Sequence, residues 1–320
     1  FAVWDSVEQE LFLARDPFGI KPLYYQKDGH GLAFASEIKA LLTTDRRSRK
    51  MNGPGIADYL MFQYTLGDKT LFENIYKLMP GHWMRVRADG CIKIKEYWKP
   101  RFDKVPDNEE KAARILRELL NDSVRNNSRC DVALGYSLSG GIDSASIVGL
   151  SGNAQKKSDD TFSVGFQENE TLNEIRVAAE LSRSYGKSHH AVLPTPDDFK
   201  EHLGQLIWHL DEPVAAPGAF AQFVMAKTAS RHVRVLLGGN GADELFGGYV
   251  RNYLLYQHDA ANDLSAGDLT RNKNQLCGYG PLAEKLDRLG PQSSPEDIHL
   301  ALITRRDGLQ AQAGSELREM

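Results

Sequence analysis

The stretch Val132-Ala-Leu-Gly-Tyr-Ser-Leu-Ser-Gly-Gly-Ile-Asp-Ser-Ala-Ser-Ile-Val-Gly-Leu150 decides how this chain folds. It opens with a short apolar run, which predicts a buried strand of a parallel sheet. The run ends at Ser139-Gly-Gly-Ile-Asp-Ser144, and a helical pattern follows. The two glycines permit a sharp turn and a close approach to a ligand, because neither has a Cβ. Since a helix N-terminus favours an anion, this turn predicts a phosphate cradle.

The polar side chains of the turn suit a pyrophosphate group. Ser139 and Ser144 add hydroxyl donors, and Asp143 adds a carboxylate that could hold Mg²⁺ against phosphate oxygens. The turn lacks the Gly-Lys-[Ser/Thr] of a Walker P-loop and the third spaced glycine of a dinucleotide fingerprint. The structural alternative is a Gly-Gly turn with a helix cap at Asp143 or Ser144. The stretch resembles the PP-loop of the ATP pyrophosphatases, which cleave ATP between its α and β phosphates.

A second glycine-rich stretch follows another apolar run, Val233–Leu237. It is Gly238-Gly-Asn-Gly-Ala-Asp-Glu-Leu-Phe-Gly-Gly-Tyr249. Because ligands sit beyond the carboxyl ends of parallel strands, we expect it to lie at the same sheet edge as Ser139–Ser144. Asp143 and Asp243, with phosphate oxygens, would then make an Mg²⁺ site. The structural alternative is a glycine-rich connection with helix caps.

The pattern around these stretches predicts an α/β fold. Strand-like runs alternate with amphipathic segments, which indicates a parallel sheet flanked by helices on both faces. Candidate helix starts are Asp107, as a cap, and Thr171-Leu-Asn-Glu174, as a capping box. The strand-like runs are Val132–Leu138, Thr161–Phe166, His189–Leu193 and Val233–Leu237.

The first part of the chain predicts antiparallel β structure. Phe1–Trp4 and Leu11–Arg15 are strand-like around a polar turn, and Pro22–Tyr25 and Gly31–Ala35 form a second pair. This pattern predicts an antiparallel meander. A β unit of this size is too small for a core of its own, so we interpret it as the end of a larger β-rich domain.

The same part of the chain carries a family resemblance. Ala14-Arg-Asp-Pro-Phe-Gly-Ile-Lys-Pro-Leu-Tyr-Tyr25, Phe34–Leu41 and Thr70–Trp83 closely resemble the end of the glutaminase domain of glutamine-hydrolysing asparagine synthetases. Gly238–Tyr249 resembles the GxGxDExFGGY signature of that family. The family's glutaminase is an N-terminal-nucleophile amidohydrolase. Its N-terminal cysteine and glutamine-binding residues have no match here, so we expect this chain to lack glutaminase activity.

The resemblance, which covers about residues 1–253, implies two domains. Residues 1–98 would be the C-terminal part of a glutaminase-like domain with its connecting hairpin. Residues 99–320 would be a C-terminally incomplete PP-loop synthetase domain with an adenine-nucleotide hydrolase-like fold. Residues 260–320 are polar and weakly patterned, and match neither the family's catalytic lysine nor its Val-Pro-Phe-Leu-Asp motif.

The implied activity is that of an asparagine biosynthesis ligase of the glutamine amidotransferase type. Aspartate's side-chain carboxylate would be adenylated by MgATP, and ammonia derived from glutamine would displace AMP after pyrophosphate has left. Two alternatives stay open. One is a same-fold amidotransferase or β-lactam-synthetase-like enzyme that acts on another carboxylate. The other is a non-catalytic relative that binds a nucleotide or a partner.

The resemblance also implies site residues. Asp143 and Asn240 are the candidate catalytic residues, and Asp143 and Asp243 the candidate Mg²⁺ ligands. Asparagine synthetases often have Glu or Asp at the position of Asn240, so one hypothesis is impaired ammonia capture or a different acceptor. The alternative is that Asn240 only shapes a turn, because Asn tolerates a positive φ. The candidate ATP-binding residues are Leu138, Ser139, Gly140, Gly141, Asp143, Ser144, Val164, Gly165, Gly238 and Gly239.

The composition is that of an ordinary soluble globular protein. The 320 residues are 41% hydrophobic and 26% charged, with a net charge of -4, and suffice for two cores. Neither the charge nor any apolar stretch favours nucleic acid or membrane. The family resemblance implies small-molecule substrates, with a homodimer left open. The few, widely spaced cysteines argue against a disulfide framework or a Cys-rich metal site and favour the cytoplasm: Cys91, Cys130 and Cys277.

Two adjacent histidines, His189 and His190, raise the question of a metal site. Successive residues on a strand point to opposite faces of a sheet. The two rings are therefore not expected to bind one ion together.

Overall fold

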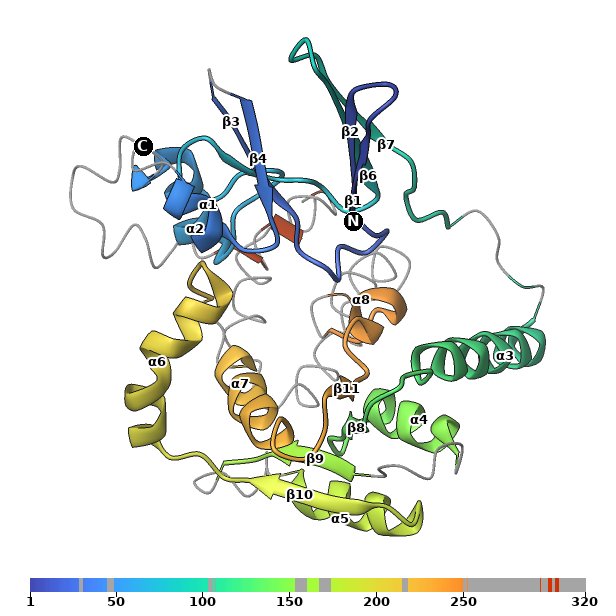
Figure 1. Ribbon diagram of the computed structural model, residues 1–320. Helices are drawn as coiled ribbons and strands as arrows, with labels where there is room; N and C mark the ends of the chain where they lie inside the picture. The colour runs from blue at the N-terminus through green and yellow to red at the C-terminus, as the bar shows by residue number, and fades with distance from the viewer. Residues whose placement is uncertain are drawn as a thin grey trace. The chain divides into compact units, whose positions relative to one another are not determined.

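The structure is a computed structural model, and Figure 1 shows the course of the chain. It describes residues 1–28, 31–44, 49–102, 106, 108–152, 160–166, 174–214 and 218–249, together with 252, 294, 299–300 and 303–304. Most of the weakly patterned segment 260–320 lies outside these residues. None of the helices described has both the length and the apolar character needed to cross a bilayer.

The chain forms two compact units. Unit 1 comprises residues 1–104, 207–215 and 303–320, and unit 2 comprises residues 105–206 and 216–302. Unit 1 therefore includes a short segment, 207–215, that the sequence places in the middle of unit 2.

Unit 2 is built on a parallel sheet with the strand order β10-β9-β8-β11. Each strand-like run predicted for this part of the chain is a strand here, which confirms the predicted parallel sheet. The register pairs Gly135 with Asp160 and Leu236 with Gly135, so β8 lies between β9 and β11. The strands are β8 (Leu134–Ser137), β9 (Asp160–Val164), β10 (Ser188–Val192) and β11 (Val235–Leu237).

Helices cover both faces of this sheet. On one face, Leu134, Tyr136 and Leu138 pack with Val148 of α4 and Ala178 of α5. On the other face, Phe162 of β9 packs with Met225 and Ala229 at the end of α7. The alternation of side chains along each strand delivers apolar groups to both layers, so the predicted α/β fold is confirmed. The helices are α3 (Glu109–Asn127), α4 (Ile142–Ser151), α5 (Ile175–Ser184), α6 (Pro196–Leu210), α7 (Gly218–Ala229) and α8 (Ala242–Phe246).

The N-cap of α3 is one residue later than the sequence pattern predicts. Asn108, not Asp107, takes this position, and its side chain accepts a hydrogen bond of 2.8 Å from the N–H of Lys111. Both residue types favour this position, so the pattern could not choose between neighbours.

Unit 1 contains two antiparallel sheets rather than the single meander that the sequence pattern predicts. The first has the order β1-β2-β6-β7 and the second the order β4-β3-β5. Both predicted hairpins are present, but β2 pairs onward with β6, whereas β3 pairs with β5. The strands are β1 (Ala2–Asp5), β2 (Glu10–Ala14), β3 (Tyr24–Asp28), β4 (Gly31–Ala35), β5 (Ile75–Lys77), β6 (His82–Arg87) and β7 (Ile92–Glu96).

An ordered loop carries the chain from the first sheet to the second, which explains why the strands do not form a meander. The guanidinium of Arg15 donates to the carbonyl oxygens of Lys21 (3.1 Å), Leu78 (2.8 Å) and Gly19 (3.0 Å). The carboxylate of Asp16 accepts backbone N–H groups of the same loop, including that of Lys21 at 2.9 Å. These bonds hold the loop away from a strand conformation.

Helix α1 (Ile38–Thr44) packs on the second sheet of unit 1, next to α2 (Gly53–Phe62). Ile38 and Leu41 of α1 are buried against Ile75 of β5. The hydroxyl of buried Thr70 stabilises the loop beside them, because it lies within hydrogen-bond distance of the carbonyl oxygens of Phe72 (3.0 Å) and Ile75 (2.8 Å).

The segment 207–215 supplies the N-terminal cap of α1. The carboxylate of Asp211 accepts the backbone N–H groups of Ile38 (2.7 Å) and Lys39 (3.2 Å), although it lies 173 positions after Ile38. It also pairs with the ammonium of Lys39 at 2.9 Å. A carboxylate at this position satisfies free N–H groups and complements the helix dipole.

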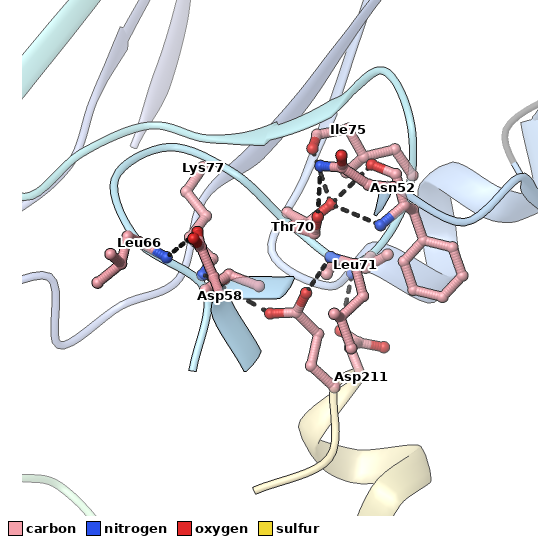
Figure 2. Close-up of polar contacts among 12 residues, drawn as sticks. Asn52, Asp58, Leu66, Thr70, Leu71, Ile75, Lys77 and Asp211 are labelled. Atoms are coloured by element: carbon pink, nitrogen blue, oxygen red, sulfur yellow. Dashed lines mark hydrogen bonds and ion pairs between the residues drawn. The ribbon is translucent and has the colours of Figure 1, made fainter. Parts of the chain in front are cut away.

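Glu212 extends the same anchor to the loop before β5. Its carboxylate accepts the N–H of Leu71 at 2.6 Å and lies 3.7 Å from the ammonium of Lys77. Figure 2 shows Leu71, Lys77 and Asp211 in this network, beside Asp58. The two acidic residues therefore tie the segment 207–215 to helix α1 and to the loop before β5.

Candidate functional site

The strand order of unit 2 creates a topological switch point at the carboxyl ends of its strands. From β8 the chain moves to β9 and β10 on one side, and β11 returns to the other side of β8. A sheet of this type has its topological switch point between the two strands where the order reverses, which are β8 and β11 here. Ligands of open parallel sheets bind at such a point, and both glycine-rich stretches begin there.

The first of these stretches is a compact turn held by its own serines. The Ser144 hydroxyl accepts the N–H of Ser139 at 2.9 Å, and the two serine hydroxyls are also 2.9 Å apart. The hydroxyl of Ser139 accepts the N–H of Gly141 at 3.2 Å. Through these contacts both serines shape the turn. The sequence pattern presents them only as hydroxyl donors to phosphate.

A carboxylate already occupies one N–H donor of this turn. The N–H of Gly140 donates to Oε2 of Glu174 at 3.0 Å. Glu174 precedes α5, and its side chain makes no cap bond to that helix. The turn thus presents a backbone donor that binds an anionic oxygen, which is the property expected of a phosphate cradle.

The sequence pattern misses this contact of Glu174. It assigns Glu174 to a capping box with Thr171, a residue outside those that the structure describes. The contact joins positions 34 apart in sequence, and no local spacing rule connects them. The only signal in the sequence for this contact is an acidic residue just before a helix, and that signal is weak.

The second glycine-rich stretch lies directly against the first. A Cβ added to Gly239 would lie 2.9 Å from the carbonyl carbon of Asp143 and 3.0 Å from the backbone nitrogen of Ser144. Real Cβ atoms do not approach backbone atoms this closely, so only glycine permits the two loops to meet here. The expected proximity of the two stretches at one sheet edge is therefore present.

The ends of neighbouring strands complete the surroundings. The N–H of Leu138 donates to the carbonyl oxygen of Phe162 at 2.9 Å, and the N–H of Gly165 donates to that of Val192 at 3.0 Å. Leu138, Val164 and Gly165 thus lie at the carboxyl ends of β8 and β9. Gly238 directly follows β11, and it lies near the side chain of Ser137 at the end of β8.

Asp243 and Asn240 have local surroundings that the sequence pattern does not show. A carboxylate oxygen of Asp243 lies against Gly248, within the turn that ends α8. The amide oxygen of Asn240 lies against Gly238, and the positive φ of +96° in this turn belongs to Gly241 instead. A tolerance for positive φ therefore does not explain Asn240. The pairing of Asp143 with Asp243 on one Mg²⁺ stays a prediction.

Unit 1 contains a separate cavity of about 570 Å³. Its wall includes Arg15, Asp16, Phe34 and Tyr97. The hydroxyl of Tyr97 donates to the carbonyl oxygen of Arg15 at 2.8 Å, so the wall is held by hydrogen bonds on this side. Two of the motifs that carry the family resemblance in this unit therefore line one cavity.

Family models match both parts of the chain. The model described as asparagine synthase matches residues 115–318, and the model described as glutamine amidotransferase domain matches residues 1–98. The family resemblance drawn from the motifs is therefore confirmed.

Individual relatives agree with these matches. The chain is 39% identical over 249 residues to asparagine synthetase [glutamine-hydrolyzing] 1 of Bacillus subtilis, covering 78% of this chain and 39% of that protein. It is 40% identical over 257 residues to a putative asparagine synthetase [glutamine-hydrolyzing] of Mycobacterium bovis, with the same two coverages of 78% and 39%. The chain thus spans about two fifths of the length of these curated relatives.

A solved structure with some similarity is the NH3-dependent NAD synthetase of Campylobacter jejuni. It is 15% identical, with a TM-score of 0.30, and the alignment covers 66% of this chain and 99% of that one.

Proposed function

The chain belongs to the asparagine synthase family, and from that premise we propose that it uses ATP to form an amide from a carboxylate. The acceptor that we propose is the side chain of aspartate. One of its oxygens attacks the α-phosphorus of ATP, the bond to the bridging oxygen breaks, and pyrophosphate leaves with the electron pair. Ammonia then attacks the activated carbonyl carbon and loses a proton, and AMP leaves.

One observation carries the proposal: Gly239 lies against Asp143 and Ser144 at the switch point of the sheet. This close approach brings together the two loops, of which the first has backbone donors and each has a carboxylate. A nucleotide that loses pyrophosphate needs such donors, aimed at where negative charge develops.

The residues of this site suit the ATP that we propose as substrate. The pyrophosphate would bind Ser139, Gly140, Gly141 and Ser144, where the N–H of Gly140 already donates to a carboxylate oxygen. The adenosine would lie on the strand ends, as implied by the family resemblance. The residues proposed for this second contact are Val164, Gly165 and Gly238, and Leu138 and Gly239 are further proposed ATP-binding residues.

Mg²⁺ is the metal that we propose for the same site. Asp143 and Asp243 would hold the ion, because Mg²⁺ prefers a few carboxylates together with phosphate oxygens and water. When bound, it neutralises charge that develops on the leaving pyrophosphate. The protein's own part is to hold Asp143 at the start of α4, next to the Gly-Gly turn.

Two further side chains have a place in this proposal. Glu174 must release the N–H of Gly140 before a phosphate oxygen can take it, so Glu174 and pyrophosphate compete for one donor. Asn240 lies between the glycines of the second loop, where it would contact the reacting carboxylate or ammonia as a neutral hydrogen-bonding group.

Glutamine is the proposed ammonia source of the whole protein. We assign residues 1–98 to a glutaminase-type domain with its connecting hairpin and residues 99–320 to the synthetase domain. The match of the glutamine amidotransferase model to residues 1–98 supports this assignment.

Calorimetric titration with MgATP tests the site. Asp143→Asn and Asp243→Asn each remove a carboxylate charge, and we expect each to weaken MgATP binding about tenfold or more. Asp89→Asn is the matched control, because Asp89 lies in the turn between β6 and β7, where it accepts the N–H of Cys91 at 2.9 Å. Equal affinities in all three variants would reject the site assignment.

ATP–pyrophosphate exchange tests the acceptor. We expect exchange in the presence of aspartate and little with glutamate, succinate or a β-amino acid. Exchange that depends on another carboxylate would reject aspartate while leaving the site intact, whereas no exchange with any carboxylate would reject the ligase itself.

A further inference from the structure

A cluster of three side chains lies in unit 2, away from the glycine-rich loops. Asp160, His190 and His232 each offer one ligand atom, and these atoms all lie within 4.8 Å of one another. Asp160 is the first residue of β9, and His232 precedes β11, so both lie at the amino ends of strands. The site proposed for ATP lies at the carboxyl ends.

The side chains are already close to one another. Nε2 of His190 lies 3.3 Å from Oδ1 of Asp160, and the ring centroids of His190 and His232 are 4.2 Å apart. A cation bound between the two imidazoles and the carboxylate would contact all three side chains.

A buried aromatic ring supports both histidines. Phe162 has an exposed fraction of 1%, and its ring stacks on that of His190 at 5.0 Å and 16°. It also lies 5.8 Å from the ring of His232. Stacking on the face of an imidazole leaves its nitrogen lone pairs, which lie in the ring plane, available to a metal ion.

The backbone that carries His232 is fixed by the end of α7. Its N–H donates to the carbonyl oxygen of Ala229 at 2.9 Å, and the N–H of Val233 donates to the same oxygen at 2.8 Å. Ala229 and Val233 are buried with exposed fractions of 2% and 4%. His232 is therefore held between two anchored positions.

Gly135 makes room for this arrangement on the neighbouring strand. A Cβ at Gly135 would lie 2.7 Å from Cε2 of Phe162 and 3.2 Å from Cγ1 of Val233. The absence of a side chain there lets Phe162 and Val233 pack under the cluster.

We propose that Asp160, His190 and His232 form a binding site for a divalent transition metal of the Zn²⁺ type, separate from the proposed MgATP site. Two imidazole nitrogens and one carboxylate oxygen are ligands that Zn²⁺ and its neighbours prefer, whereas Mg²⁺ prefers oxygen ligands. A fourth position is left for water.

The geometry needs only a small adjustment to bind such an ion. Tetrahedral ligands at about 2.0–2.1 Å from Zn²⁺ lie roughly 3.3 Å apart. The ligand atoms must therefore close by no more than about 1.5 Å, which rotation about side-chain bonds supplies. The ion would join β9, β10 and the connection from α7 to β11.

Zn²⁺ titration of metal-free protein against a chromogenic chelator tests the proposal. We expect one tight site per chain, and a Co²⁺-loaded protein with the visible absorption of a four-coordinate ion. His232→Gln and Asp160→Asn should each weaken Zn²⁺ binding at least a hundredfold. His202→Gln is the control, since His202 lies on α6 with its Nε2 at 3.2 Å from the ammonium of Lys227, outside the cluster.

Thermal unfolding provides a second measurement that does not depend on any activity. Zn²⁺ should raise the melting temperature of the wild type and of His202→Gln, but not that of His232→Gln, whose altered side chain is exposed. Equal Zn²⁺ affinity in wild type and His232→Gln would overturn the proposal. Since MgATP binding is measured separately, failure here leaves the proposed ligase function untouched.

Discussion

Gly239 is the residue at which the proposed ATP site tolerates least change. In Gly239→Ala the new Cβ would lie 2.9 Å and 3.0 Å from backbone atoms of Asp143 and Ser144, which cannot rotate away. The two loops must then separate. We expect ATP–pyrophosphate exchange to fall at least tenfold, about 1.4 kcal/mol, and the free energy of unfolding to fall by about 1–3 kcal/mol. Exchange assays and urea denaturation measure the two effects.

Gly204 provides the matched control for this prediction. It lies within α6, and a Cβ there would have no atom within 4 Å. Gly204→Ala should keep full exchange activity and raise the free energy of unfolding by about 0.5–1 kcal/mol, because glycine weakens a helix interior. If both variants exchanged pyrophosphate at the same rate, the close approach of the loops would have no role in ATP binding.

Single residues show where sequence reasoning reaches its limit. The different surroundings of adjacent histidines follow from the two-residue repeat of a strand: His189 contacts the Thr161 hydroxyl at 2.9 Å, whereas His190 contacts Asp160. The repeat directs these two rings to opposite faces of the sheet, as predicted. It says nothing of His232, because only strand order and register bring that ring to His190.

At the scale of elements, α1 depends on a carboxylate far away in sequence. In Asp211→Asn the residue keeps an acceptor oxygen and tolerates its φ of +63°, but it loses the charge that pairs with Lys39. The Asp211 side chain is only 6% exposed, so solvent cannot replace this partner well. We expect the free energy of unfolding of unit 1 to fall by about 1–3 kcal/mol in chemical denaturation.

An exposed ion pair on α6 gives the comparison. Asp197 and Lys200 are 2.9 Å apart, but their side chains are 89% and 76% exposed. Asp197→Asn should therefore change the free energy of unfolding by less than about 0.5 kcal/mol. If Asp211→Asn also lowered the free energy of unfolding by less than about 0.5 kcal/mol, the cap would contribute little to the stability of unit 1.

Elements with strong local patterns could be predicted from the sequence, and contacts between them could not. Each strand of the parallel sheet follows from an apolar run, such as Thr161–Phe166, with its boundary shifted by a residue or two. The cap on α1 has no local signal, because Asp211 and Ile38 meet only in the folded chain. The division of the N-terminal strands into two sheets has no local signal for the same reason.

On the scale of the whole molecule, the two proposed sites should respond separately to their ligands. Hydrogen exchange followed by mass spectrometry measures protection of each segment. MgATP should slow exchange in Ser139–Ser144 and Gly238–Gly241, because binding holds both loops closed. Zn²⁺ should slow it around His190 and His232 instead.

The β6–β7 hairpin is the internal reference for this experiment, since it belongs to unit 1 and to neither proposed site. Its exchange should stay constant with both ligands. Protection by MgATP that appeared around His232 but not at the glycine-rich loops would contradict the placement of the nucleotide at the carboxyl ends of the strands.

The architecture as a whole was predictable in class but not in arrangement. The alternation of strands and helices predicts a parallel sheet, and ligand binding beyond the carboxyl ends of its strands follows from general rules. The order β10-β9-β8-β11, which creates the switch point, depends on how strands pair. The contact of Gly239 with Asp143 is a consequence of that order, so the sequence alone predicts only that the two loops share an edge.

The origin of the α1 cap has a consequence for protein synthesis. Asp211 emerges from the ribosome 173 residues after Ile38, a delay of roughly 9–35 s at about 5–20 residues per second. Throughout that interval the nascent helix lacks the carboxylate that closes its first turn, and the loop at Leu71 lacks Glu212. Co-translational folding of unit 1 therefore stays incomplete until most of the parallel sheet has been translated. Chaperones can bind the incompletely folded unit 1 during this interval.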